Sequence, residues 1–374
     1  MRKTFQYRLY PTATQQKLLE GQLSEACRLY NAALQERREA YKSHGVSLNY
    51  YDQAKQLKEI RERGDLGLAN YHCCQNVLKR LDKAFAAFFD RVKQGQRAGF
   101  PRFKSHRRYD SITFPSYGDG NKIVGDGHLR IQDVGAIKIK LHREVAGKIK
   151  TTTVKRECGQ WYVCFSCEVA PQPLEPNEKQ VGIDVGLENF ATRSDGEAIP
   201  NPQYYQKAQA KLRRAQRKVA RRQNHKSKRR RKAILLLQKA HQHVANQRKD
   251  FQHRESYKLV RDFGTIVVED LNVKGLSGGR LAKAVHDVGW SSFIEMLRYK
   301  AENAGRQLME VDANYTSQEC PQCHAVARKS LSERVHRCGC GLTLGRDHAA
   351  ALVILGRGLR LQAQTKPEVR ASVV

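Results

Sequence analysis

The sequence is short of acidic residues and lacks any long apolar run. Its 374 residues include 68 Lys and Arg but only 37 Asp and Glu, which leaves a formal net charge of +31. No segment approaches the ~18 consecutive apolar residues of a membrane-spanning helix, no apolar leader follows Met1, and no internal repeat is evident. We therefore expect a cytoplasmic protein without a membrane span. Since 40% of the residues are hydrophobic, we also expect folded domains rather than general disorder.

The shortage of acids is greatest between residues 198 and 249, which contain no Asp or Glu and 17 Lys and Arg. Fourteen of these cations lie within residues 207–232. Apolar residues keep helical spacing through this stretch and beyond it: Ala208, Leu212, Ala215, Val219, Ile234, Leu237, Val244 and Phe251. A solvated helix face or a disordered run is the alternative, but the spacing favours a packed helix pair with cationic outer faces. Such faces bind the phosphates of DNA or RNA without reading sequence.

Hydrophobic periodicity divides the chain into regions of different character. It predicts a short strand at residues 5–9, helices from 14 to about 93, short strands from 95 to 171 that suggest a small barrel or sandwich, and then a proline-rich linker. A strand around Asp184, the basic helices, a strand around Glu269, a helix from about 291 to 305 and a final helix from Asp347 follow. The pattern is typical of a multidomain α+β protein.

Acidic residues occupy three positions where a carboxylate is unusual. Asp184 lies in an apolar strand between Gly182 and Gly186, and Glu269 and Asp270 end another apolar strand. Alternation places those two on opposite faces, so only one can face Asp184. Asp347 begins an apolar helix.

Each acid alone has an ordinary explanation: a salt bridge for Asp184, a strand-end turn for Glu269 and a helix cap for Asp347. Together, in a basic chain, they match metal-dependent phosphodiester cleavage. That reaction needs carboxylates from several elements to hold two Mg²⁺ ions.

Four cysteines are spaced as metal ligands: Cys320, Cys323, Cys338 and Cys340. Two thiolate pairs separated by 14 residues predict a structural Zn²⁺ site of the ribbon or knuckle type. Because the second pair has a single intervening residue, His324 or His336 could replace one thiolate. The site would hold together a loop just before Asp347, and it could position that residue. The other six cysteines show no comparable pairing; Cys164 and Cys167 are spaced as a possible ligand pair, but they lie within an apparent strand, which favours burial.

These motifs resemble those of the TnpB family of RNA-guided DNA endonucleases, which insertion sequences encode and which are related to type V CRISPR effectors. The resemblance covers nearly the whole chain. Five segments carry it: Gly99–Lys104 (GFPRFK), Val181–Leu187 (VGIDVGL), Val268–Leu271 (VEDL), Tyr315–Cys323 (YTSQECPQC) and Gly345–Ala350 (GRDHAA). It implies that Asp184, Glu269 and Asp347 are the catalytic acids of a RuvC-like nuclease.

The resemblance also implies a domain organisation and partners. The implied parts are a wedge β-barrel domain at 1–10 and 95–175, a helical recognition domain at 11–94, an RNase H-like (RuvC) α/β nuclease domain at 181–319 and 342–360, a zinc-binding insertion at 320–341 and a disordered tail at 361–374. The implied partners are a transposon-derived guide RNA and a target DNA with a short adjacent motif. A monomer bound to RNA, associated with a prokaryotic nucleoid, is expected.

Nucleic-acid contacts are predicted at polar and basic positions in both halves of the chain. Gln75 and Asn76 precede the helix Val77–Phe88, where amide side chains could reach an adenine edge. The alternative for Gln75 and Asn76 is plain helix capping. For Ser111 and Thr113, which lie in the matching β segment, the alternative is ordinary hydrogen bonding within a strand. The full predicted set is Gln75, Asn76, Arg102, Lys104, Ser111, Thr113, Lys211, Arg213, Arg214, Arg217, Arg221 and Arg222.

Two positions depart from the family pattern. Gly345 stands where the last motif usually begins with Asp, and Ala349 stands where Asn usually follows the catalytic Asp by two residues. The alternatives to a guided nuclease are a guided repressor that binds without cleaving, and an unguided RuvC-like nuclease or transposase. Three intact acids argue against the repressor. His241-Gln242-His243 lacks the His-hydrophobe-His pattern of a single-strand transposase.

Overall fold

The computed structural model describes residues 1–365 except 68, 69, 126, 226, 273, 274, 276, 277, 279–281 and 331, and the chain divides into two compact units, Met1–Ala170 and Pro171–Val374. The division falls at the predicted proline-rich linker. Backbone amides of Gln172 and Leu174 donate to the carbonyls of Asn303 and Ala304 at 2.8 and 3.0 Å, so the linker begins by packing on the second unit. Among the described helices, none is both long and apolar enough to cross a bilayer.

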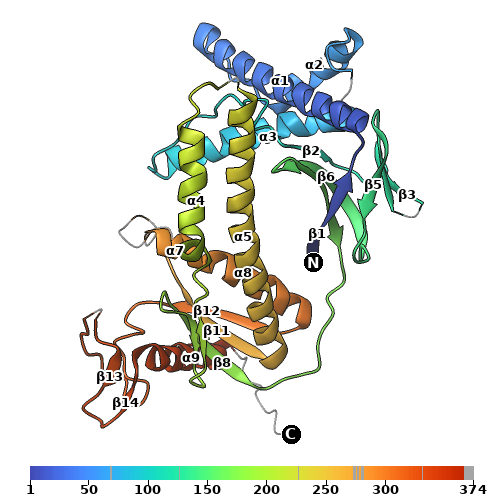
Figure 1. Cartoon of the computed structure of the whole chain (residues 1–374). Helices are drawn as coiled ribbons and strands as arrows, with labels where there is room; N and C mark the ends of the chain where they lie inside the picture. Colours follow the sequence, from blue (N-terminus) through green and yellow to red (C-terminus); the bar gives the residue numbers. More distant parts are fainter. Residues whose placement is uncertain are drawn as a thin grey trace. The chain divides into compact units, whose positions relative to one another are not determined.

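The first unit combines three helices with one seven-stranded sheet, drawn in blue to green in Figure 1. Its elements are β1 (Arg2–Tyr10), α1 (Ala13–His44), α2 (Tyr50–Glu62), α3 (Tyr71–Lys93), β2 (Ser111–Phe114), β3 (Asn121–Val124), β4 (His128–Ile131), β5 (Gly135–Lys140), β6 (Lys148–Glu157) and β7 (Gln160–Glu168). The strand order is β2-β6-β7-β1-β5-β4-β3, a single sheet and not the pair of sheets of a sandwich.

Alternation along β1 shows why this sheet and the helices share one core. Phe5, Tyr7 and Leu9 are buried, and the intervening residues are more exposed, as the sequence predicted. Because β1 pairs with both β7 and β5, it joins the two halves of the sheet. The helices α1 to α3 and the strands β2 to β7 fall in the helical and β regions that the sequence predicted, but the sequence did not predict the breaks between the helices.

The second unit contains a five-stranded sheet, a long helical hairpin and a small β-hairpin. Its elements are β8 (Gln180–Val185), β9 (Asn189–Arg193), β10 (Ala198–Pro200), α4 (Tyr204–Ala220), α5 (Lys228–Asp262), β11 (Thr265–Asp270), α7 (Ala282–Val288), α8 (Trp290–Ala304), β12 (Gln307–Asp312), β13 (Val335–Arg337), β14 (Thr343–Gly345) and α9 (Arg346–Thr365). The sheet order is β10-β9-β8-β11-β12. β9 is antiparallel to both β10 and β8, whereas β11 is parallel to both β8 and β12.

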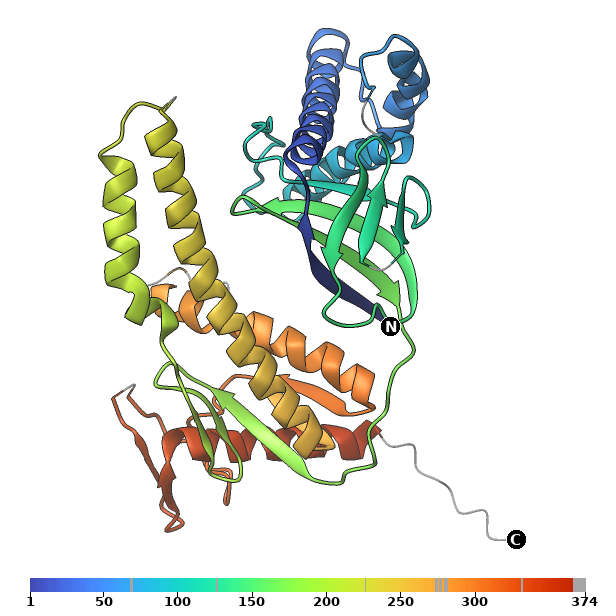
Figure 2. The ribbon, with the colours of Figure 1, turned by 45° about the vertical axis from the view of Figure 1, so that its right-hand side comes forward.

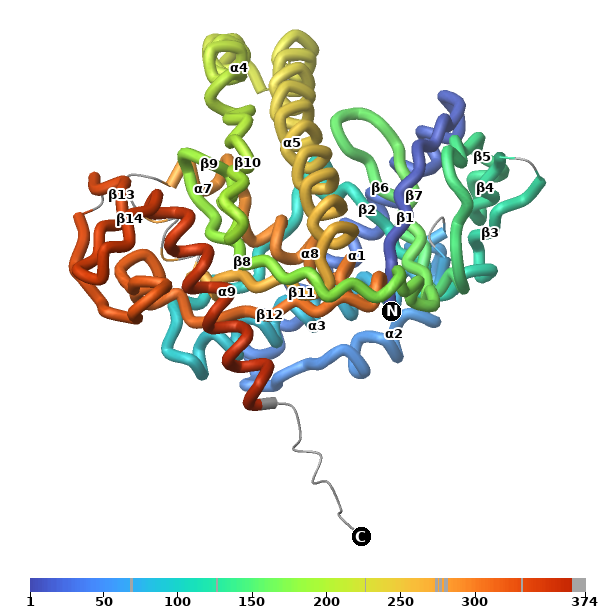
Figure 3. The backbone as a smooth tube through the Cα atoms, turned by 90° about the horizontal axis from the view of Figure 1, so that it is seen from below, coloured from blue at the N-terminus to red at the C-terminus, as the bar shows by residue number. Residues whose placement is uncertain are grey.

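Helices cover both faces of this sheet, with α5 and α8 on one face and α9 on the other (Figure 2). Residues of β11 alternate between the two cores. Ile266 and Val268 pack with α5 and α8, whereas Val267 packs with Ile354 of α9 and Val311 of β12. The tube view shows α9 running across β8, β11 and β12 (Figure 3).

Two glycines permit α9 to approach the sheet closely. A Cβ atom on Gly182 of β8 would lie 2.2 Å from the carbonyl oxygen of Ala351, and one on Gly358 of α9 would lie 2.5 Å from a methyl carbon of Val267. Of the two glycines that flank Asp184 in the sequence, Gly182 therefore has a close neighbour, and that neighbour is the backbone of α9. This contact fixes where α9 begins.

The end of α9 differs from the sequence expectation. The helix continues to Thr365, so residues 361–365 are helical where a disordered tail was predicted. Hydrophobic periodicity did not predict these helical residues, because the last two turns of α9 are mostly exposed to solvent. The remainder of the expected tail, residues 366–374, lies outside the described residues.

Two glycines of α9 give a matched test of this packing. Gly358→Ala should lower the free energy of unfolding by about 1–3 kcal/mol, because the added methyl group must displace the buried side chain of Val267. Gly356→Ala, two residues earlier, meets no atom within 4 Å and should raise it by about 0.5–1 kcal/mol through helix propensity. Urea unfolding of both variants measures the difference. Equal effects at the two positions would contradict the close-packing explanation.

Candidate active site and cysteine cluster

Three acids meet on the face of the sheet that α9 covers. Asp184 lies two residues after Gly182, and Glu269 lies two residues after Val267, so alternation directs both side chains towards the α9 face. β8 and β11 are parallel, with Ile183 opposite Val268, so the two acids sit at the same end of the sheet. Asp347 is the second residue of α9.

Electrostatics show that the three carboxylates interact. Burial, and then the charges of Glu269 and Asp347, raise the pKa of Asp184 well above its usual value, while the Arg346 guanidinium opposes this rise. Burial also raises the pKa of Glu269, whereas the hydrogen bond from Thr316 opposes the rise. The surroundings of Asp184 and Glu269 therefore disfavour their ionised forms in the absence of a nearby cation.

The structure separates the two neighbouring acids of β11. Glu269 is only 7% exposed, and Asp270 is exposed. Asp270 follows Val268 in the alternation, which points it away from the α9 face. The choice that strand alternation left open is therefore resolved in favour of Glu269.

A small cavity adjoins Asp347. It has a volume of about 230 Å³, and its lining includes Glu188, Asn189, Thr192, Arg334, Arg346, Asp347 and His348. Arg346 donates to the carbonyls of Ser330 and Glu333, and the His348 ring lies 3.0 Å from the Ser194 carbonyl oxygen. The cavity thus places basic side chains beside a carboxylate, an arrangement that would suit an anionic group.

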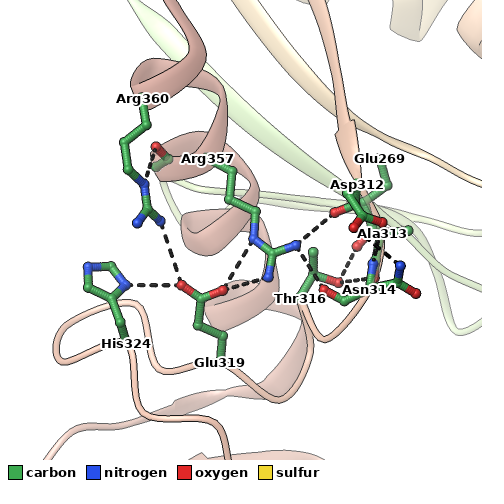
Figure 4. Close-up of polar contacts among 10 residues, drawn as sticks. Glu269, Asp312, Ala313, Asn314, Thr316, Glu319, His324, Arg357 and Arg360 are labelled. Carbon is green, nitrogen blue, oxygen red and sulfur yellow. Dashed lines mark hydrogen bonds and ion pairs between the residues drawn. The ribbon is translucent and has the colours of Figure 1, made fainter. Parts of the chain in front are cut away.

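A polar network that includes Arg357 of α9 connects Glu269 to the cysteine loop (Figure 4). Thr316 donates to Glu269, and Arg357 of α9 binds Glu319 at 2.6 Å. Glu319 directly precedes the first cysteine of the cluster and also lies 3.0 Å from the ring of His324. The sequence analysis did not identify these roles. Thr316 and Glu319 lie within a motif that carried the family resemblance, but Arg357 stands in an ordinary helical stretch that gave no signal.

The four predicted cysteines come together. The Sγ atoms of Cys320, Cys323, Cys338 and Cys340 all lie within 4.8 Å of one another, with Cys320 to Cys340 at 3.7 Å and Cys323 to Cys338 at 3.4 Å. A tetrahedral ion with metal–sulfur bonds of ~2.3 Å requires sulfurs about 3.8 Å apart, so the quartet fits such a metal. Within the described part of the chain, no other set of His, Cys, Asp and Glu forms such a compact group, the three acids included.

The cysteine quartet makes the expected histidine replacement unnecessary. His324 contacts Glu319, and the ring of His336 is buried against Lys329. Although burial opposes it, backbone N–H groups of Cys323 and Gln322, together with the side chains of His336 and Cys338, lower the pKa of Cys320 to about 5, which favours the thiolate. The short Cys338-Gly339-Cys340 spacing is therefore compatible with four thiolate ligands.

The basic helices form the packed pair that the sequence predicted. α4 and α5 lie side by side, with Leu212, Ala233 and Val244 buried (Figure 1). Five of the six cations predicted to contact nucleic acid are exposed, namely Lys211, Arg213, Arg214, Arg217 and Arg221, whereas Arg222 is half-buried and donates to the carbonyl of Lys218. The cationic outer face is confirmed.

The predicted contacts in the first unit have different surroundings. Helix α3 begins at Tyr71, capped by Asn70, so the expectation that Gln75 and Asn76 stand at a helix start is wrong; both are half-buried inside the helix. The Asn70 cap was missed because the apolar stripe begins later. Thr113 accepts a hydrogen bond from Arg80 at 2.7 Å.

Ser111 and the two basic residues of the loop are placed as follows. Ser111 is half-buried, and its backbone carbonyl accepts from Arg80 at 2.9 Å. Arg102 and Lys104 are exposed. The backbone of Lys104 exchanges two 2.8 Å hydrogen bonds with the side chain of Asn31, which fixes this loop on α1.

Comparison with known proteins assigns the chain to a family. Residues 163–280 match the IS605 OrfB family, described as a probable transposase, and residues 290–354 match the TNB domain of Cas12f1-like proteins. A candidate RNA-guided DNA endonuclease of Streptomyces pristinaespiralis is 32% identical over 97% of this chain and 91% of its own length. The chain belongs to the TnpB family. A relative from Escherichia coli K12 with a similar name is 30% identical over 90% of this chain and 87% of its own.

More distant members and a solved structure extend the comparison. A TnpB-like protein of Acanthamoeba polyphaga mimivirus is 23% identical over 94% of this TnpB-family chain and 72% of its own length. The cryo-EM structure of a Cas12f1–sgRNA–target DNA complex shares the fold, with a TM-score of 0.60 and 14% identity over 95% of this chain and 98% of that one. Residues 1–45 match a helix-turn-helix domain, but the structure has one strand and one unbroken helix there.

The two residues that depart from the TnpB pattern, Ala349 and Gly345, lie at or next to the start of α9. Ala349 is 2% exposed within the first turns of α9, so the position usually held by Asn is filled here by a buried methyl group. Gly345 ends β14 opposite Val335 and directly precedes α9. Neither change removes a carboxylate from the acid cluster.

The raised pKa of Asp184 predicts a pH-dependent stability. A raised pKa means that the folded chain holds the proton more tightly than the unfolded chain, so ionised Asp184 costs stability. The cost is absent below the unfolded pKa of about 4 and grows as the pH rises towards the folded value. Asp184→Asn should therefore raise the free energy of unfolding in EDTA, and the gain should increase from pH 4 to pH 8. Urea titrations at several pH values measure it.

The exposed neighbour provides the control for this prediction. Asp270→Asn changes the same kind of group outside the cluster, and we expect no such pH-dependent gain. Added Mg²⁺ should stabilise the parent protein more than Asp184→Asn. A variant no more stable than the parent across the whole pH range would contradict the repulsion described above.

Proposed function

We propose that this TnpB-family protein is an RNA-guided DNA endonuclease with a RuvC-like, Mg²⁺-dependent active site. The observation that carries the proposal is the convergence of Asp184, Glu269 and Asp347 on one face of the sheet, with raised pKa values at the first two. The names of the relatives support the guide RNA and DNA as partners. The order β10-β9-β8-β11-β12, with a hairpin followed by parallel strands, supports an RNase H-like fold.

The three acids fit the chemistry of hydrated Mg²⁺, which prefers carboxylate oxygens. Two such ions would supply an activated water and stabilise the leaving oxygen of the phosphodiester. The residues of the chain do the rest. Asp184, Glu269 and Asp347 would hold the ions, and the cationic lining beside Asp347 would orient the phosphate.

The exposed cations of α4 and α5 supply binding that does not depend on sequence. Residues 198–249 contain no carboxylate to neutralise them, so their field acts on phosphates of the guide or target strands. We assign backbone contacts to Lys211, Arg213, Arg214, Arg217, Arg221 and Arg222, with Arg102 and Lys104 in the first unit. For target-motif reading, Gln75, Asn76, Ser111 and Thr113 remain candidates that only mutation can test.

The proposed roles of the domains in the first unit also follow from the resemblance to the TnpB family. The seven-stranded sheet of the first unit corresponds to a wedge domain, and α1 to α3 correspond to a recognition domain inserted after β1. In a guided enzyme, the protein holds the heteroduplex by its backbone and shape, and the RNA selects the sequence. A monomer bound to RNA in the prokaryotic cytoplasm fits these parts.

We also propose that the cysteine quartet holds one Zn²⁺. Four thiolates in a tetrahedral arrangement favour zinc over the hard ions of the acid cluster. Arg346, whose side chain bonds the carbonyls of Ser330 and Glu333, links the cysteine loop to the start of α9. Zinc would thereby order the loop that precedes Asp347.

Zinc content tests this assignment. Purified protein should contain about one zinc per chain, and Cys320→Ser should reduce it and destabilise the second unit, because a thiolate ligand is lost. Elemental analysis and thermal unfolding measure both effects. Cys158→Ser, in the first unit and outside the quartet, is the control and should leave the zinc content unchanged. Active protein without zinc would refute the site.

A guide exchange tests the function as a whole. Purified protein should be combined with RNAs that share a scaffold and differ only in the guide segment, and cleavage of two DNA targets should be followed in Mg²⁺ and in EDTA. Cleavage should move from one target to the other with the guide, because base pairing selects the target. Cleavage that ignores the guide would favour an unguided nuclease, and guide-dependent binding without cleavage would favour the repressor.

Variants of Asp184 and of the two β11 acids sharpen the same experiment. Glu269→Ala and Asp184→Ala should abolish cleavage and leave guide-dependent DNA binding intact, because the binding cations lie elsewhere. Asp270→Ala, which removes the exposed neighbour, should retain most of the activity. Cleavage by Asp184→Ala at the parent rate would refute the assignment of the acids.

A further inference from the structure

Glu269 is held by a hydroxyl group from outside its own strand. The Thr316 Oγ1 donates to Glu269 Oε1, and both residues are buried, with Thr316 4% exposed. A hydroxyl has one proton; the carboxylate is its closer and charged acceptor, and the carbonyl of Ala313 at 3.2 Å is the alternative. The bond occupies one oxygen of Glu269 and fixes the plane of its carboxylate.

The turn that presents Thr316 has an unfavourable backbone. Tyr315 directly before it has a φ of 62°, in the left-handed region that a bulky residue avoids, and its side chain is exposed. Such a conformation persists only where surrounding contacts determine it. The amides of Gln318 and Glu319 both donate to the Tyr315 carbonyl at 2.9 Å, which closes the turn.

Arg357 of α9 supplies the contacts that hold this turn in place (Figure 4). Its guanidinium donates to the backbone carbonyls of Asp312 and Asn314, each at 2.8 Å, and to the Glu319 carboxylate at 2.6 and 3.2 Å. The planar, multidentate geometry of arginine fixes both ends of the segment at once. Thr316 lies between these two anchored ends.

We propose that Thr316 is a positioning residue for the metal site, and that Arg357 acts through it. By holding Oε1 of Glu269, Thr316 aims the other oxygen at the ion and reduces the reorganisation that metal binding requires. Partners that orient a metal ligand in this way typically contribute 10- to 100-fold to metal affinity. The inference rests on the proposed function only in assigning Glu269 as a ligand.

The test compares Thr316→Val with Thr316→Ser. Valine has nearly the same shape but no hydroxyl, so the Mg²⁺ concentration for half-maximal cleavage should rise by about 10- to 100-fold, with most of the rate recovered at saturating Mg²⁺. Serine keeps the hydroxyl and should stay close to the parent. A calorimetric titration of Mn²⁺ into guide-free protein should show the same loss of affinity without any cleavage.

Other outcomes are decisive as well. An unchanged metal requirement in Thr316→Val would overturn the proposal, and so would equal losses of metal affinity in the valine and serine variants.

Should Thr316→Val fail to fold, Arg357→Gln carries the test, because it should raise the Mg²⁺ concentration for half-maximal cleavage while Thr316 is intact. If the parent protein cleaves and Glu269→Ala does not, a negative result at Thr316 rejects this inference alone. A parent protein that binds Mn²⁺ but never cleaves rejects the function and not the inference.

Discussion

The close contact between α9 and β8 is the constraint on which the acid cluster depends. Gly182 leaves no side chain between the strand and the helix, so the backbone of α9 lies directly on the sheet. Because Asp347 is near the start of that helix, the depth and direction of the contact determine where its carboxylate ends. A larger residue at Gly182 would move α9 and separate Asp347 from Asp184 without touching either acid.

The molecule separates its two kinds of charge by burial. The acids that interact with one another are at least partly buried, whereas most cations of α4 and α5 are exposed to solvent. Buried charges act strongly over a few ångströms, and exposed charges act weakly but over a whole surface. Under the proposed function, many weak contacts would hold a long polyanion while a few strong groups act on one bond.

Local patterns predicted the strands that carry the acids, the basic helix pair and the cysteine quartet, because alternation, helical spacing and ligand spacing are properties of short segments. Alternation could not choose between Glu269 and Asp270, since the answer depends on which face α9 covers. The role of Arg357 could not be predicted for the same reason, because its hydrogen-bond partners lie 38 residues or more away in sequence. The start of α3 was misplaced because the Asn70 cap lies ahead of the apolar stripe.

The order of the acids along the chain has a consequence during synthesis. Asp184 and Glu269 belong to strands made early in the second unit, but Asp347 arrives only with α9. The cationic hairpin of α4 and α5 is complete well before that point. A nascent or truncated chain that ends ahead of residue 346 therefore carries the surface that attracts nucleic acid, leaves Val267 and Val311 without their helical cover, and lacks the third carboxylate. If the proposed roles of the hairpin and the acids hold, the ability to bind a nucleic acid precedes the ability to cut it during synthesis.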